Sequence, residues 1–295
     1  MATRITGRRW KAMAAVLAAA SGMAAHAVAL ASPAAALPGG TEYVNLGDSV
    51  SAGSGVAPIA SGQLPQCWQS EQNFAHIVAA ESGYRLTDVS CGGAKTGDFY
   101  QPQYPGTRAQ LDALSPSTEL VTVMIGGNNN DTFAGAMATC IGAWAVSPGA
   151  FDPCKSRYGA GLFEPITSQT YPALVKALED VHARAPRAHV VVVGYPWLLP
   201  ATGGCFPQFP IAQGDVPYLR DLQATLNDAI ARAAAETGTS FVDMARVSEG
   251  HDGCKPVGER WIEPLVYSAQ PVPVHPNADG ERALAREVAA VIANG

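Results

Sequence analysis

The sequence predicts an α/β fold in which helices cover both faces of a parallel β-sheet. Short apolar segments alternate with longer segments of helical periodicity, which is the pattern of βαβ units. Several short segments are rich in valine and isoleucine, as expected for strands that are buried on both faces. No repeat, charge run or linker marks a second domain, so we expect residues 37–295 to form one domain.

Five segments have the composition of strands, and four have the periodicity of helices. The expected strands are Tyr43–Leu46, Leu86–Val89, Leu120–Ile125, His189–Val193 and Ser240–Val242. The expected helices, most of which end at glycine or proline, are Glu71–Ser82, Pro172–Ala185, Pro217–Glu236 and Ala278–Ala293. Residues 134–169 are rich in Gly, Pro and Ser, and we expect them to form a long surface excursion.

Residues 1–36 have the pattern of a secretory signal peptide. Four basic residues lie between Arg4 and Lys11, a small apolar stretch follows, and Ala34–Ala36 offers a cleavage site. A membrane anchor is the alternative, but the stretch is rich in alanine and a processing site follows it. We therefore expect export and no membrane span in the mature chain, and Arg8-Arg9 leaves the twin-arginine route open.

The charge balance excludes some partners. Residues 1–36 hold four basic and no acidic residues, so their removal changes the formal net charge from −6 to −10. An acidic surface argues against nucleic acid or an anionic membrane as the main partner. We expect a secreted, extracellular monomer.

All six cysteines lie after the predicted signal peptide, and an even number in an exported protein indicates disulfides. Several pairings are possible, and the sequence alone does not choose among them. We favour pairing in sequence order because it would hold the loops around the candidate site. These pairs are Cys67–Cys91, Cys140–Cys154 and Cys205–Cys254. No C-x-x-C or His/Cys cluster occurs, so we expect no metal site.

Gly47-Asp48-Ser49 follows the first expected strand. Ligands of open α/β sheets bind at the carboxyl ends of the strands, so Ser49 is placed to act as a nucleophile. Asp48 would support it by shaping the turn. A helix N-cap is the alternative role for this serine. No G-x-S-x-G motif occurs, which disfavours the α/β-hydrolase fold.

Two further blocks follow the second and third expected strands. In Cys91-Gly92-Gly93-Ala94, the backbone N–H of Gly93 can approach a substrate because no side chain intervenes. In Gly126-Gly127-Asn128, the Asn128 amide is a neutral donor suited to an oxyanion hole. Simple turns are the alternative for both blocks.

His275 lies on the loop before the last helix, where a general base can point into a cleft. His251 is the competing base because Asp252 follows it. Adjacent side chains rarely point together, and that segment leads directly into Cys254, so we favour His275.

The order Ser49, Gly93, Asn128, His275 resembles that of the SGNH, or GDSL, serine hydrolases and covers the whole mature chain. The chain is more closely similar to secreted actinobacterial GDSL lipases, esterases and phospholipases A1. Segments that carry this closer likeness include Tyr195-Pro196-Trp197, Gly214–Leu219 and Arg260–Pro264. The resemblance implies a flavodoxin-like three-layer α/β/α sandwich with a five-stranded parallel sheet. It also implies an oxyanion hole formed by the Ser49 N–H, the Gly93 N–H and the Asn128 side chain.

The sequence departs from this family at two positions. Many members carry an aspartate three residues before the histidine, where this chain has Val272. We therefore expect a Ser–His dyad in which the backbone carbonyl of Val272 orients His275. Asn129 stands where aspartate is commoner in the family, and we expect this difference to alter the support of the loop that carries Asn128.

The expected function is a cofactor-free serine esterase that acts on a small-molecule or lipid ester, as a lipase, arylesterase or phospholipase A1. The acyl pocket should be apolar, and its expected aromatic lining is Phe99, Trp144, Trp197 and Phe206. A carbohydrate acetyl esterase on the same scaffold and a non-catalytic binding protein are the alternatives.

Overall fold

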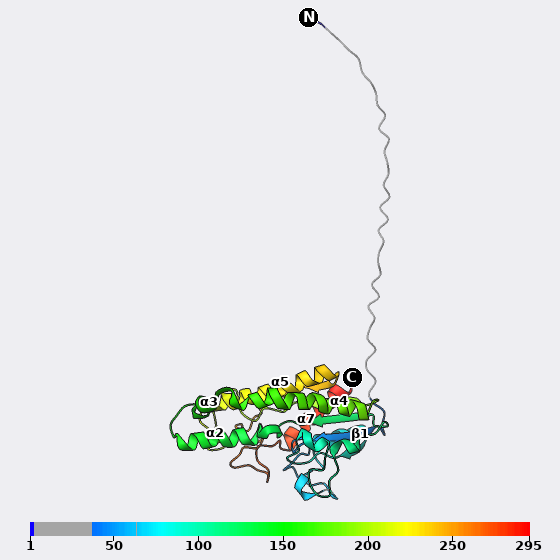
Figure 1. Cartoon of the computed structure of the whole chain (residues 1–295), viewed down its shortest axis with the longest axis horizontal. Coiled ribbons are helices and arrows are strands. Elements are labelled where there is room, and N and C mark those ends of the chain that lie inside the picture. The colour runs from blue at the N-terminus through cyan, green and yellow to red at the C-terminus, as the bar shows by residue number, and fades with distance from the viewer. Residues whose placement is uncertain (3–36, 63) are drawn as a thin grey trace. The chain divides into compact units, whose positions relative to one another are not determined.

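A computed structural model describes residues 1–2, 37–62 and 64–295, whose secondary-structure elements all belong to one unit, Ala34–Gly295. Five parallel strands in the order β2-β1-β3-β4-β5 form the central sheet, with helices on both sides (Figure 1). The strands are β1 (Glu42–Gly47), β2 (Arg85–Asp88), β3 (Leu120–Met124), β4 (His189–Val193) and β5 (Ser240–Val242). The predicted fold class and all five strands are confirmed. Apart from residues 1–2, the predicted signal peptide lies outside the described residues.

The helices form two layers. On one face, α1 (Phe74–Ser82) packs against α7 (Ala278–Ile292), and on the other face α4 (Tyr171–Arg184) packs against α5 (Asp215–Thr237). These are the four predicted helices, with small shifts at their ends. A short helix, α6 (Met244–Val247), follows β5. Within the described residues, no helix has both the length and the apolar character that crossing a bilayer requires.

Residues 134–169 lie largely at the surface, as predicted, but they are mostly helical, which was not predicted. The segment begins with α2 (Ala134–Val146), continues with α3 (Pro153–Tyr158), and ends in short helical turns at Gly159–Leu162 and Ile166–Thr170. Alanines favour the helical conformation of α2, and its buried Met137 and Cys140 face the core. The glycines and prolines that suggested a loop lie mainly between and after the helices.

The three predicted disulfides are confirmed. Cys67–Cys91 joins the segment before α1 to the loop after β2, and Cys140–Cys154 joins α2 to α3. Cys205–Cys254 joins the connection between β4 and α5 to the segment after α6.

The register of the sheet brings the candidate blocks to one edge. Gly47 at the end of β1 pairs with Met124 at the end of β3, so the turns that carry Ser49 and Asn128 begin side by side. The N–H of Asp48 donates to the carbonyl of Met124 at 3.0 Å, which extends this pairing into the first turn.

Candidate active site

Ser49 and His275 meet at this edge of the sheet. The Nε2 atom of His275 lies 2.7 Å from the Oγ atom of Ser49, although 226 residues separate them in the sequence. His275 is positioned by the start of α7, where the side chain of Asn277 caps the helix by accepting from the N–H groups of Asp279 and Gly280. The distance is the one that proton transfer from a hydroxyl to a general base requires.

The carbonyl that orients His275 belongs to Pro273, so the prediction of Val272 is wrong. The Nδ1 atom of His275 lies 2.8 Å from the Pro273 oxygen. The Val272 carbonyl instead accepts a hydrogen bond from Gln270 at 3.1 Å. The physical reason is the positive φ of 60° at Val274, which turns the chain so that the Pro273 carbonyl faces the ring.

This contact fixes the tautomer of His275. A carbonyl oxygen only accepts, so the proton resides on Nδ1 and Nε2 is free to accept the proton of Ser49. Burial lowers the pKa of His275, and the hydrogen bond to Pro273 partly opposes that shift. The ring is therefore a neutral base at neutral pH.

The three candidate oxyanion donors lie on the segments that follow β1, β2 and β3. Among the described residues, the backbone N–H groups of Ser49 and Gly93 donate no hydrogen bond, so both are available to a ligand. The Asn128 side chain donates to the Ala94 carbonyl at 3.1 Å and keeps its second amide hydrogen. Ser49 and Asn128 line one pocket, whereas Gly93 lies on the exposed loop beside Ala94.

Asn129 supports this loop with a neutral amide. Its Oδ1 accepts from the N–H of Thr96 at 3.0 Å, and its Nδ2 donates to the Thr96 hydroxyl at 2.7 Å. The amide therefore ties the turn after β3 to the loop after β2, which carry Asn128 and Gly93 respectively.

Asp48 directly precedes Ser49 in the sequence and is buried. Its Oδ1 accepts from the N–H of Val50 at 3.0 Å, and its Oδ2 accepts from the hydroxyl of Tyr195 at 2.5 Å. Burial raises the pKa of Asp48 to about 6, although the hydrogen bond from Tyr195 lowers it. Tyr195 was not among the predicted site residues, although it follows the end of β4 closely and therefore lies at the same edge of the sheet.

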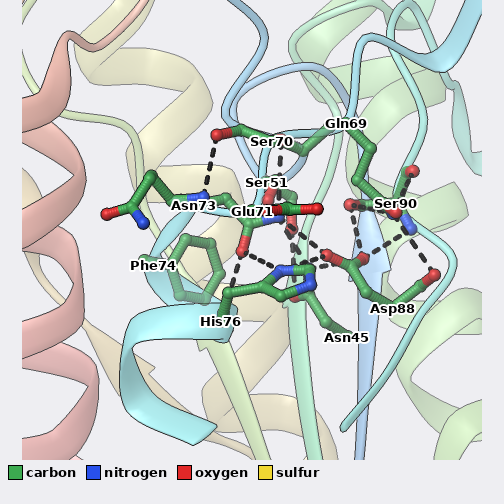
Figure 2. A network of polar contacts seen from close by, with 12 residues as sticks. Asn45, Ser51, Gln69, Ser70, Glu71, Asn73, Phe74, His76, Asp88 and Ser90 are labelled. Carbon is green, nitrogen blue, oxygen red and sulfur yellow. Dashed lines mark hydrogen bonds and ion pairs between the residues drawn. The ribbon is translucent and has the colours of Figure 1, made fainter. Parts of the chain in front are cut away.

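A buried polar network joins the turn that carries Ser49 and Ser51 to neighbouring elements (Figure 2). Asp88 at the end of β2 accepts from the side-chain amides of Asn45 at 2.9 Å and Asn73 at 2.7 Å. The Asn45 oxygen in turn accepts from the hydroxyl of Ser51, two residues after Ser49, at 3.0 Å. The network thus joins β1, β2 and the start of α1 to the turn that carries Ser49.

Ser49 and His275 open onto an apolar pocket of about 360 Å³. One wall is formed by the start of α2 and the residue before it, and the other walls are formed by loops. Apolar side chains that line it include Phe133, Met137, Ile141, Leu198, Ile262 and Leu265.

None of the four aromatic residues predicted to line the acyl pocket is among its lining residues. Phe99 is buried in the core, Trp144 packs against Phe206 with ring centroids 5.4 Å apart, and Trp197 lies under the Arg220 guanidinium. The prediction failed because α2, which was not predicted, supplies aliphatic side chains in their place.

The side chain of His251, the competing candidate base, contacts residues other than Ser49. Its ring stacks on Trp261 at 4.0 Å between centroids, and its Nδ1 lies 2.5 Å from the Glu259 carbonyl. Among the described residues, no group of three His, Cys, Asp or Glu side chains is arranged to hold a metal ion.

Comparisons with known proteins agree with this geometry. The GDSL-like Lipase/Acylhydrolase family matches residues 46–283. Lipase 2 of Streptomyces coelicolor is 52% identical over 268 residues, which are 90% of this chain and 90% of that protein. The crystal structures of phospholipase A1 from Streptomyces albidoflavus NA297 and of the extracellular lipase from Streptomyces rimosus are each 28% identical. They superpose with TM-scores of 0.71 and 0.70, and each comparison covers 85% of this chain and 99% of the other. The chain therefore belongs to the GDSL-like lipase/acylhydrolase family and is a carboxylic ester hydrolase.

Proposed function

We propose that this chain is an exported esterase that releases fatty acids from lipid esters by means of a Ser49–His275 dyad. The observation that carries the proposal is the 2.7 Å contact between the two side chains at the mouth of an apolar pocket. The Pro273 carbonyl takes the place of the aspartate that completes a triad in many relatives.

The geometry supports a two-step acyl transfer. Ser49 Oγ attacks the acyl carbon while His275 Nε2 accepts the hydroxyl proton, and the carbonyl oxygen becomes an oxyanion. The tetrahedral intermediate collapses, the ester C–O bond breaks, and His275 returns the proton to the departing alcohol. Water then attacks the acyl-serine with the same base, which releases the fatty acid and restores Ser49.

The oxyanion is the group that the three free donors would stabilise. The N–H groups of Ser49 and Gly93 and the Asn128 amide are preorganised by the sheet edge and by the Asn129–Thr96 link. Preorganised donors avoid the reorganisation that water would need as charge develops on the oxygen.

The pocket favours a fatty acyl group over an acetyl group. An acetyl group needs almost no apolar wall, whereas this pocket has one formed by α2 and its neighbouring loops. The relatives named lipase and phospholipase A1 point the same way. Export is supported by the pattern of residues 1–36 and by the extracellular lipase among the similar structures. We propose a monomer, which light scattering during size-exclusion chromatography checks.

The proposal is tested on p-nitrophenyl esters of increasing chain length. Ser49→Ala and His275→Ala should each lower kcat/KM at least about a thousandfold, whereas His251→Ala should leave it nearly unchanged. Esters longer than acetate should be the better substrates. Turnover retained by Ser49→Ala would refute the dyad, and a sharp preference for acetate would favour the carbohydrate esterase.

A further inference from the structure

Tyr195 is a buried tyrosine whose hydroxyl joins two parts of the site. It lies just after β4 and, like Asp48, is 1% exposed. The hydroxyl donates to Asp48 Oδ2 at 2.5 Å and accepts from the backbone N–H of Gly127 at 2.9 Å. The carboxylate only accepts, so the directions of both hydrogen bonds are fixed.

The two partners of this hydroxyl flank the reacting groups. Asp48 immediately precedes Ser49, and its other oxygen holds the N–H of Val50 on the far side of the serine. Gly127 immediately precedes Asn128. One hydroxyl therefore connects the turn that carries the nucleophile to the turn that carries the side-chain oxyanion donor.

Tyr195 is itself held on three sides. The Asn227 side chain on α5 accepts from the N–H of Tyr195 and donates to its carbonyl, each at 2.9 Å. Its ring packs edge-on against Phe133, with centroids 4.9 Å apart. The tyrosine is thus a rigid reference point to which both turns are attached.

We infer that Tyr195 is a positioning residue that sets the spacing between the Ser49 N–H and the Asn128 amide. This inference rests on the proposed function, since it assumes that both groups bind the oxyanion. Such donors act only when they lie within about 2.7–3.1 Å of the developing charge. The buried Asp48 carboxylate also polarises the Tyr195 hydroxyl, which strengthens the hydrogen bond that this hydroxyl accepts from the Gly127 N–H.

Tyr43 provides a matched control. It is also fully buried, and its hydroxyl also makes a side-chain hydrogen bond, to Thr122 at 2.7 Å. That contact lies between β1 and β3 inside the sheet, and Tyr43→Phe leaves in place the hydrogen bond from Thr122 to Asn45 through which Thr122 is joined to Ser51. Tyr43→Phe therefore removes a buried hydroxyl without touching the proposed link.

The first experiment compares Tyr195→Phe with Tyr43→Phe. Tyr195→Phe keeps the ring against Phe133 and deletes only the hydroxyl. We expect kcat on a p-nitrophenyl ester to fall about 10- to 100-fold with KM changed less than about twofold, because the donors act in the transition state. Tyr43→Phe should change kcat less than about twofold. Each rate is divided by the fraction of active protein, which is titrated with a fluorophosphonate, so that misfolded protein does not lower the kcat obtained.

The second experiment is a double-mutant cycle with Asn128→Ala. Once the Asn128 amide is gone, its position no longer matters, so Tyr195→Phe should then cost less than about threefold in kcat. Losses that multiply independently would overturn the inference, as would an equal loss in Tyr43→Phe. If Tyr195→Phe does not fold, Asp48→Asn removes the charge at the other end of the link, and the same non-additivity is expected.

The outcomes separate this inference from the proposed function. A wild-type chain without esterase activity would refute the proposed function. An active wild type in which both Tyr195→Phe and Asp48→Asn are silent would refute only the role of Tyr195.

Discussion

Val272 occupies the position at which a carboxylate would complete a triad, and the Pro273 carbonyl takes over only part of its role. A carbonyl fixes the tautomer of His275 but carries no charge to stabilise the imidazolium that would form in the proposed reaction. Since burial also lowers the pKa of His275, the ring stays neutral and basic further into the acid range than an exposed histidine.

This predicts the pH dependence of activity. Protonated His275 cannot accept the serine proton, so kcat/KM should fall as the pH drops through a pKa below 6.5. Asp48, with a pKa of about 6, is the other group that titrates there. A pH–rate profile of the wild type and of Asp48→Asn measures the effect. An acid limb above pH 7 in both proteins would contradict the shift assigned to His275.

Among the elements, α2 forms one wall of the apolar pocket beside Ser49, which we propose holds the acyl chain. Met137 and Ile141 lie one helical turn apart on the same face and line the pocket. The length of this wall therefore limits the acyl chain that fits.

Ile141→Trp should shorten the pocket and move the preference toward shorter esters, lowering kcat/KM for long chains about tenfold or more. Val146→Trp is the matched control because Val146 lies on the same helix, is 71% exposed and does not line the pocket. Kinetics on esters of graded length measure both. An unchanged length profile in Ile141→Trp would remove α2 from the acyl site.

The packing of α7 on α1 contains a buried acid, Glu281. One carboxylate oxygen accepts from the N–H of Phe74 at 2.8 Å, and the other has no partner within the described residues. Burial, with a smaller contribution from Asp88, raises the pKa of Glu281 well above its usual value. A raised pKa means that its contribution to stability is full at acid pH and is lost as the pH rises toward its folded pKa.

Glu281→Gln should therefore be neutral or destabilising at pH 5 and stabilising at pH 8. A gain of about 1 kcal/mol would raise Tm by roughly 2–4 °C in a chain of this size. Glu287→Gln, at the surface of the same helix, should show no such trend. Thermal denaturation at the two pH values measures it, and a gain that does not grow with pH would contradict the shift.

At the scale of the whole molecule, residues 37–295 carry a formal net charge of −10. Anionic surfaces should repel the enzyme, and salt should screen the repulsion. We expect hydrolysis of an ester in anionic vesicles to speed up as NaCl is added, with little change in zwitterionic vesicles. Rates in the two vesicle types measure this, and faster hydrolysis in anionic vesicles at low salt would contradict it.

The sequence predicted the strands and the strand-end residues because burial and chain direction leave a periodic signal. That signal placed Ser49, Asn128 and His275, which follow a strand or precede a helix. It did not predict Pro273 as the orienting carbonyl, because the backbone angle at Val274 depends on how the loop packs. It also did not predict α2, because the glycines of this segment are typical of a loop. The link through Tyr195 was not predicted either, because it depends on a contact between residues 147 positions apart.

The proposed reaction depends on Ser49 as the nucleophile and on His275 as its base. Reaction with a fluorophosphonate followed by mass spectrometry identifies the nucleophile, because the serine attacks this reagent as it would attack an ester. We expect one adduct per chain on Ser49, complete loss of hydrolysis once it has formed, and very slow labelling of His275→Ala. An adduct on another residue, or hydrolysis that survives full labelling of Ser49, would contradict it.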